Sequence, residues 1–175
     1  MSQLLPKTEQ QKPLNAEEAE STVRNLALRR LSRSAVTEFQ LREYLARKNA
    51  DPQIVDSVIQ RFIAAKLIND AEYAEMWVRS RRNMRGAGPT TMRRELKQRG
   101  VDEAIIAAAV EARDGDDYEL ARSLAERKLN GLRGLTADAQ FRRLMSFLVR
   151  RGHTASVAIS VTRDVLRDVA VVEDF

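Results

Sequence analysis

The sequence has no cysteine, one histidine and few aromatic residues, and each scarcity excludes a class of protein. Among 175 residues, Phe, Trp and Tyr together make up 5%. The absence of cysteine excludes disulfides and thiolate chemistry and is typical of a reducing compartment. No apolar run approaches the roughly 20 residues that a membrane-spanning helix needs. The opening MSQLLPKTEQQKP lacks the apolar segment of a signal peptide, so we expect a cytoplasmic protein without a membrane anchor.

The residues that are abundant favour a folded, helical and basic protein. Charged residues make up 31% of the chain and hydrophobic residues 43%, which argues against overall disorder. Leu, Ala, Arg and Glu dominate, and they form helices more readily than strands. The net charge of +5 indicates an anionic partner, with nucleic acid as the first candidate. The predicted fold class is therefore all-α.

One turn pattern occurs three times, at intervals of 51 and 52 residues. Each copy has a leucine near a helix end, a basic residue, a Gly or Asn suited to a left-handed turn, and then a capping residue followed by apolar residues. Any helical protein can carry one such turn by chance, but three copies in step indicate a repeat. Helix pairs of this size cannot bury a core alone, so neighbouring copies must stack. The copies are LARKNADPQIV (45–55), LKQRGVDEAII (96–106) and LVRRGHTASVA (148–158).

Capping signals divide the chain into helices and modules. Capping boxes are predicted at Asn15 with Glu18, Thr37 with Gln40, and Asn69 with Glu72. The pattern predicts an elongated, curved array of tandem three-helix repeats of the helix-turn-helix type. The expected parts are a disordered tail at 1–14, an N-terminal helix plus the first repeat at 15–85, the second repeat at 86–131, and the third repeat with a short acidic tail at 132–175.

No arrangement of residues in the sequence indicates catalysis. His153 aligns with Ala50 and Val101 of the other copies, which favours a structural role. Neither HExxH nor a GxxxxGK[ST] loop is present, and GAGPTT around Gly88 is read as a helix start, with a contact to a nucleic-acid phosphate left open. We predict no enzyme, no cofactor and no metal site. One acidic run lacks the spacing of an EF-hand and is predicted to be a solvated turn. It consists of Asp114, Asp116, Asp117 and Glu119.

Basic residues are concentrated between positions 79 and 99, where eight cations and one Glu give +7 in 21 residues. Like charges four residues apart on one helix repel each other, so the fold is not expected to need them. The cluster is predicted to meet an external anion or an acidic protein surface, whereas scattered arginines such as Arg29 are read as solvated helix faces. Tyr73 and Trp77 are predicted to be core rather than base-stacking residues. The predicted partner-binding residues are Arg79, Arg81, Arg82, Arg85, Arg93, Arg94, Lys97, Arg99, Arg142, Arg143, Arg150 and Arg151.

With these elements placed, the sequence resembles the RecX family of regulatory proteins over roughly residues 23–167. Asn49 stands where the family usually has glycine, and His153 where it often has an aromatic residue. The segments that carry the resemblance are LALRRLSRSAVTEFQLREYLARKN, IQRFIAAKLINDAEYAEMWVRSRR, GAGPTTMRRELKQRGVDEAIIAAAV and FRRLMSFLVRRGHTASVAISVTRDVL.

The resemblance implies a regulator of recombination, DNA repair and the SOS response. RecX proteins bind the RecA recombinase and its filament on single-stranded DNA, and they restrain its ATPase, strand-exchange and coprotease activities. We therefore expect RecA as the partner, weak direct DNA binding and a monomeric chain. The alternative is a stand-alone helical DNA-binding protein with the 102–112 helix in a major groove. The acidic and apolar composition of that helix argues against this alternative.

Overall fold

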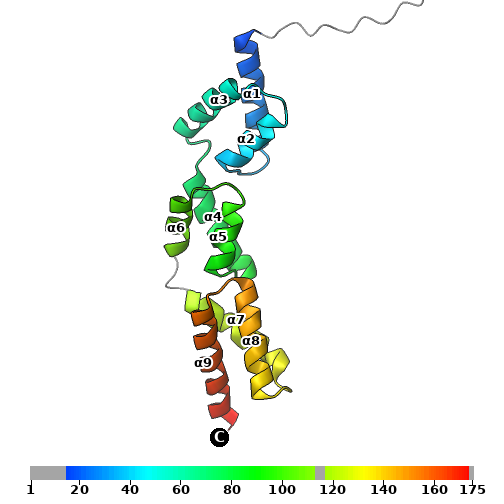
Figure 1. Cartoon of the computed structure of the whole chain (residues 1–175), viewed down its shortest axis with the longest axis vertical. Helices are drawn as coiled ribbons and strands as arrows, with labels where there is room; N and C mark the ends of the chain where they lie inside the picture. Colours follow the sequence, from blue (N-terminus) through cyan, green and yellow to red (C-terminus); the bar gives the residue numbers. More distant parts are fainter. Residues whose placement is uncertain (1–14, 113–116, 174–175) are drawn as a thin grey trace, which may run out of the picture. The chain divides into compact units, whose positions relative to one another are not determined.

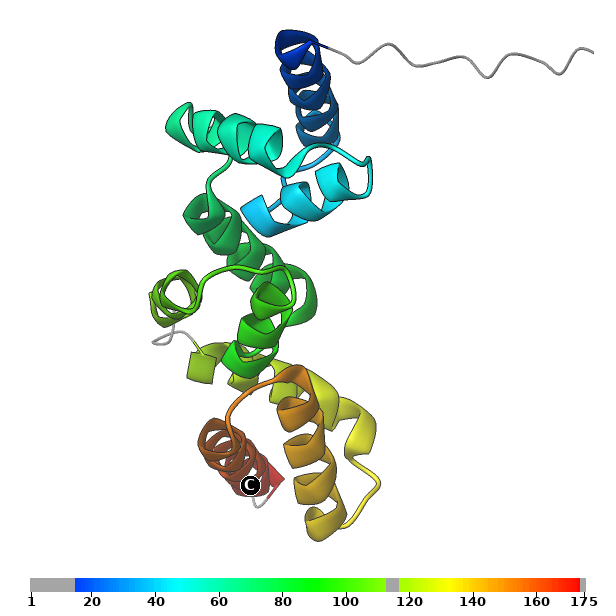
Figure 2. The ribbon, with the colours of Figure 1, turned by 45° about the horizontal axis from the view of Figure 1, so that its top comes forward.

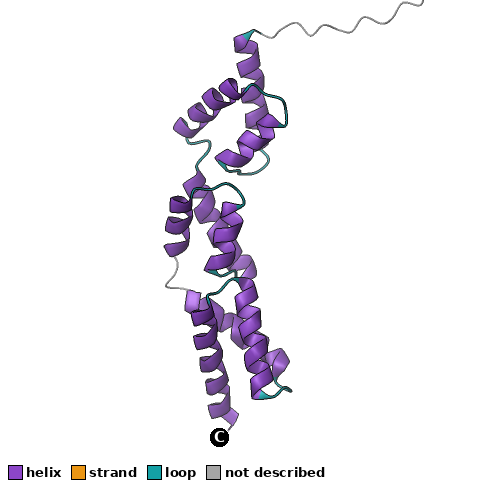
Figure 3. Ribbon diagram, in the orientation of Figure 1, coloured by secondary structure: helices purple, strands orange, loops and turns teal. Residues whose placement is uncertain are grey.

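The computed structural model describes residues 15–112 and 117–173, and its elements there are helices without any strand (Figure 3). This confirms the all-α prediction. The expected tail at residues 1–14, and Asp114 and Asp116 of the acidic run, lie outside the described residues. The described helices form two compact units, which we treat separately.

The first unit holds α1 (Ala16–Leu31), most of α2 (Glu38–Ala46) and α3 (Pro52–Ala64). Asn15 and Glu18 form the predicted capping box at the start of α1, and the helix α1 packs against α3 (Figure 1). Leu41 and Leu45 of α2 are fully buried. The apolar side of α3 is buried at Val55, Val58, Ile59 and Phe62.

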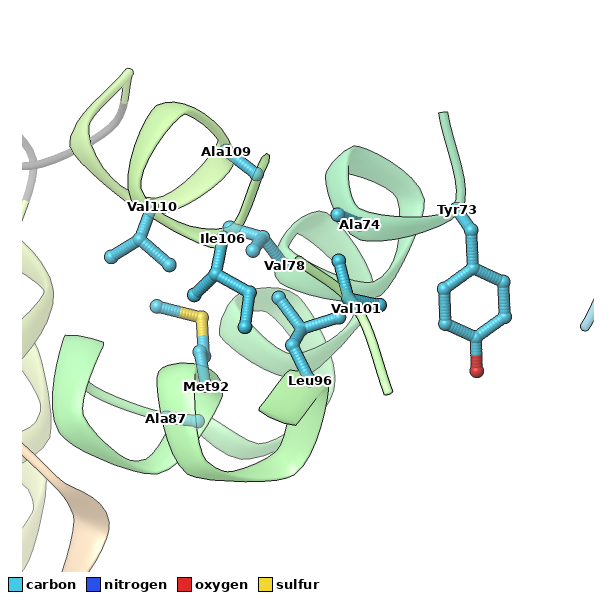
Figure 4. Close-up of a cluster of buried hydrophobic side chains, with 10 residues drawn as sticks. All are labelled: Tyr73, Ala74, Val78, Ala87, Met92, Leu96, Val101, Ile106, Ala109 and Val110. Carbon is cyan, nitrogen blue, oxygen red and sulfur yellow. The ribbon is translucent and has the colours of Figure 1, made fainter. Parts of the chain in front are cut away.

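The second unit begins with residues 36–40 and continues from Ile68. Its first three-helix group is α4 (Asp70–Arg85), α5 (Pro89–Lys97) and α6 (Glu103–Glu111). Figure 4 shows Met92 and Leu96 of α5 facing Ile106 of α6, with Val78 of α4 alongside. These four side chains are fully buried, so α4 shares its core with α5 and α6.

The other three-helix group of the second unit is α7 (Asp117–Leu129), α8 (Ala137–Arg151) and α9 (Ala155–Glu173), with a short 3-10 helix, η2 (Asn130–Leu132), after α7. The helices α8 and α9 run side by side and both pack on α7 (Figure 2). Their core includes Leu144, Leu148 and Val161, all fully buried. The helix α9 reaches Glu173, inside the predicted acidic tail, and residues 174–175 lie outside the described residues.

The three predicted left-handed turns are confirmed. Asn49, Gly100 and Gly152 have φ angles of 56°, 74° and 93°. After each turn, a backbone N–H returns to the carbonyl of the repeated leucine, as in the Schellman motif. The N–H of Ala50 is 3.2 Å from the oxygen of Leu45, and the two other copies, Val101 to Leu96 and His153 to Leu148, measure 3.3 and 3.2 Å. The same chemistry therefore ends the equivalent helix in all three copies.

The two helical groups of the second unit are joined by backbone hydrogen bonds. The N–H of Gly88 donates to the carbonyl of Arg151 at 2.9 Å, and the N–H of Thr90 donates to that of Gly152 at 3.0 Å. The start of α5 is thus fixed to the turn at the end of α8. One repeat earlier in sequence, and also inside the second unit, the Thr37 hydroxyl donates to the carbonyl of Arg99 at 2.6 Å. In both places, residues at the start of one repeat bond the backbone at a helix end of the following repeat, through N–H groups at Gly88 and Thr90 and through a hydroxyl at Thr37.

Candidate partner-binding surface of the second unit

Three residues predicted as partner-binding or core, Arg81, Arg99 and Trp77, form one structural cluster with Glu95. The guanidinium carbons of Arg81 and Arg99 lie 4.0 and 3.7 Å from the centre of the indole. The carboxylate of Glu95 accepts hydrogen bonds from the indole N–H at 3.0 Å and from Arg81 Nε at 2.7 Å. Arg99 also donates to the Glu95 carbonyl at 2.7 Å. The cluster ties α4 to the end of α5.

This cluster corrects part of the sequence interpretation. Cation–π contacts and a half-buried ion pair each stabilise such a packing by about 1 kcal/mol, so the fold does use Arg81 and Arg99. Trp77 is half-buried rather than fully inside the core, while its stacking partner Tyr73 is buried, with ring centres 5.9 Å apart. The sequence signal that was missed is Glu95, the one carboxylate inside the basic segment.

Other cations of the basic segment are occupied or hidden. Arg82 is only 8% exposed and does not belong to the outer face of α4. Arg93 and Lys97 each have a carboxylate 3.7 Å away, Glu111 and Glu103 respectively. Such exposed pairs contribute little and open readily for a competing partner.

A smaller group of cations remains exposed and has no ion pair with a carboxylate of the described residues. In α4 and α5 these are Arg79, Arg85 and Arg94; in α8 they are Arg143 and Arg150. Nothing in the local packing needs their charge, so they are available to an anionic partner. Of the remaining predicted residues, Arg142 pairs with Asp138 at 2.7 Å.

The single histidine belongs to a buried polar pair. Nδ1 of His153 lies 3.0 Å from Oδ1 of Asp117, and the two residues are 2% and 4% exposed. Asp117 is therefore not the solvated residue that the acidic run predicted. The pair joins the start of α7 to the turn before α9, and its burial leaves no opening for a substrate, so it reads as a structural contact.

A second polar network joins α7 to α9. The Tyr118 hydroxyl donates to Oδ2 of Asp164 at 2.5 Å, and Nη2 of Arg122 lies 2.6 Å from Oδ2 of Asp168. The Tyr118 hydrogen bond lowers the pKa of Asp164, with Arg167 and Arg122 adding to the effect. The same bond raises the pKa of Tyr118. The network is half-exposed and serves the packing of the third helical group.

The helix suggested as a DNA-reading element is poorly suited to that role. No group of three or more His, Asp or Glu residues among them is placed to hold a metal ion. In α6, the candidate recognition helix, Ile106, Ala109 and Val110 are buried in the core and both ends carry glutamates, Glu103 and Glu111. An acidic helix with its apolar face buried is poorly suited to a phosphate-lined groove. No described helix has the length and apolar character to span a membrane.

Family models match the chain in three consecutive segments. They are the first, second and third three-helix domains of RecX, at residues 24–62, 69–110 and 115–161. Each match groups a helix with the two that follow it, as in α4 with α5 and α6. The domains as matched therefore start one helix earlier than the boundaries expected at residues 86 and 132.

Whole-chain comparisons agree with the family models. The chain is 36% identical over 160 residues to regulatory protein RecX of Thermobifida fusca, covering 91% of this chain and 86% of that one. It is 37% identical over 146 residues to that of Streptomyces coelicolor, covering 83% and 78%. The crystal structure of RecX from Lactobacillus salivarius shares the fold, with a TM-score of 0.81 at 23% identity over 85% of this chain and 97% of that one. The chain therefore belongs to the RecX family of regulatory proteins.

Proposed function

We propose that the protein binds the RecA recombinase assembled on single-stranded DNA and inhibits its ATPase, strand-exchange and coprotease activities. The observation that carries the proposal is the match of all three RecX domains in order along the chain. Its relatives are named regulatory proteins, which points away from an enzyme.

In the proposed mechanism the tandem domains lie in the groove of the RecA filament and bridge neighbouring subunits. Bound there, the protein hinders the addition of RecA subunits or the entry of the partner duplex. The exposed, unpaired cations of the basic segment contact acidic surface of RecA or the phosphates of its DNA. Arg79 and Arg94 of the second domain are the first candidates, with Lys97 beside them once its loose contact to Glu103 opens.

The structure changes which residues should be tested. Reversing Arg81 would place a carboxylate beside Glu95 and remove a contact to Trp77, so a loss of activity would report damage to the fold. We therefore choose Arg79→Glu/Arg94→Glu/Lys97→Glu, whose side chains are all exposed. A matched control, Arg24→Glu/Arg133→Glu/Arg163→Glu, makes the same charge change at other exposed arginines.

The test measures RecA ATP hydrolysis and strand exchange on single-stranded DNA as the protein is titrated at moderate salt. Wild type and the control triple variant should inhibit at similar concentrations, and the first triple variant should need at least tenfold more protein. Circular dichroism checks that each variant is folded. If the first triple variant inhibits as well as wild type, this surface is not the contact; if wild type itself does not inhibit, the proposed function fails.

A further inference from the structure

A basic cavity lies in the second unit where the end of α4 meets α7 and α8. Its volume is about 410 Å³, within the range of small-ligand sites. Five cations line it, and no Asp or Glu does. They come from all three helices: Arg82 and Arg85 from α4, Arg127 and Lys128 from α7, and Arg151 from α8.

No hydrogen bond to a carboxylate of the described residues balances the charge of these five cations. Arg127 donates to Ser123 at 3.0 Å, and Arg151 donates to the carbonyl of Arg85. Both acceptors are neutral, so the positive charge of the cavity is not balanced by these contacts. Five like charges around one hollow repel each other, and a bound anion would relieve this repulsion.

Arg82 gives the second, independent sign of a ligand. It lines the cavity while being only 8% exposed, and its Nη1 has no hydrogen-bond partner among the described residues. A buried guanidinium with an unused donor is costly unless an acceptor reaches it. Guanidinium groups present several N–H donors in a plane and match the oxygens of a phosphate.

An aromatic ring holds part of the cavity wall in place. The side chains of Arg151 and Lys128 lie over the ring of Phe147, at 4.7 and 5.9 Å from its centre. These contacts restrict two long side chains before any ligand arrives, which reduces the entropy lost on binding. Leu120 and Leu124 add apolar surface to the same cavity, so it is not simply a solvated charge cluster.

We propose that this cavity binds a phosphate group. The group can come from the backbone of single-stranded nucleic acid or from a free phosphate compound. The inference adds a site to the proposed function and is measured with RecA absent, so either can fail alone.

The experiment uses the full chain and two probes: a fluorescent oligothymidylate and inorganic phosphate. Binding of the oligonucleotide is followed by anisotropy across a salt series, and the Phe147 ring and Arg82 side-chain signals are followed by NMR with each probe. The test variant is Arg127→Gln/Lys128→Gln, in which both residues are exposed and the fold is expected to persist. The control, Arg133→Gln/Arg163→Gln, removes the same charge from exposed arginines outside the cavity.

The test variant should bind the oligonucleotide at least fivefold more weakly than wild type, and the control less than twofold. For single strands the slope of log K against log salt is about −0.7 per contact, so losing two contacts should flatten it by about 1.4. Signal changes with the oligonucleotide alone support the strand as the source; saturable changes with inorganic phosphate support a free phosphate. Equal weakening of both variants, or no change of the Phe147 and Arg82 signals with either probe, would overturn the proposal.

Discussion

The contact between Gly88 and the end of α8 makes a sharp prediction for Gly88→Ala. A methyl group at this position would lie 2.3 Å from the backbone nitrogen of His153 and 2.4 Å from the carbonyl carbon of Gly152. Both are backbone atoms, so no side chain can move aside. The φ of Gly88 is −81°, which alanine adopts freely, so the backbone itself is not strained.

The size of the stability loss in Gly88→Ala follows from the contacts between the start of α5 and the end of α8 that must be disturbed. Relieving the overlap costs about 1–3 kcal/mol of packing, or else breaks the bonds from Gly88 to Arg151 and from Thr90 to Gly152 at about 1 kcal/mol each. The lower entropy of unfolded alanine returns at most about 1 kcal/mol. We expect the free energy of unfolding of the second unit to fall by about 1–2 kcal/mol.

The assay is urea unfolding followed by circular dichroism, together with hydrogen exchange at residues 88 and 90. Exchange at both amides should accelerate in the variant, because the joint between the two helical groups opens. Gly131→Ala is the matched control, since its added methyl meets nothing within 4 Å; its effect should stay within about 0.5 kcal/mol. A Gly88→Ala protein as stable as the control, with Thr90 still protected, would refute the reasoning.

Three further changes test other contacts. Asn49→Ala should cost about 1 kcal/mol in urea unfolding because its φ is 56°, whereas Asn49→Gly should be neutral or stabilising. Asp117→Ala should cost about 2 kcal/mol by leaving His153 buried and unpaired, and Asp117→Ala with His153→Phe should recover most of that loss. Tyr118→Phe should raise the pKa of Asp164 in an NMR titration, since it removes the largest cause of lowering. Because the folded pKa of Asp164 is lowered, its contribution to stability is present above its ordinary pKa of 3.8 and is lost as the pH falls through the folded value, so the variant should show a weaker loss in acid.

For each of these three predictions, one result would contradict the structural reasoning. Equal stabilities for the alanine and glycine variants of Asn49 would mean that the left-handed turn is not populated. A double variant of the His153 pair that is no better than the single one would show that the pair's loss is not what destabilises the chain. An unchanged Asp164 titration in Tyr118→Phe would deny the hydrogen bond between them.

The starts and ends of the helices could be predicted from the sequence, because each depends on only a few neighbouring residues. The capping box of Thr37 with Gln40 and the glycine turn at Gly152 depend only on nearby backbone geometry, and both are present. The grouping of helices was harder to predict, because a capping signal does not say which neighbour shares a core. The helix α4 was assigned from the sequence to the first repeat, with α2 and α3. In the structure its Val78 packs against Met92 of α5 and Ile106 of α6.

The partner-binding surface was also predicted less well than the helix ends, because it depends on which helices pack together. A run of cations along one segment does not reveal which of them face inward or meet a carboxylate from another helix. Arg81 is held by Glu95, fourteen residues away, and Arg82 is buried one position later. The basic cavity joins residues from α4, α7 and α8, so no single stretch of sequence contains its signature.

The central claim is that the protein binds RecA filaments rather than DNA alone, and co-sedimentation tests it most directly. The protein is mixed with RecA assembled on single-stranded DNA, or with the same DNA alone, at a salt concentration that screens simple phosphate contacts. We predict saturable recovery with the filament and little recovery with bare DNA. Equal recovery with both, or none with the filament, would contradict the account.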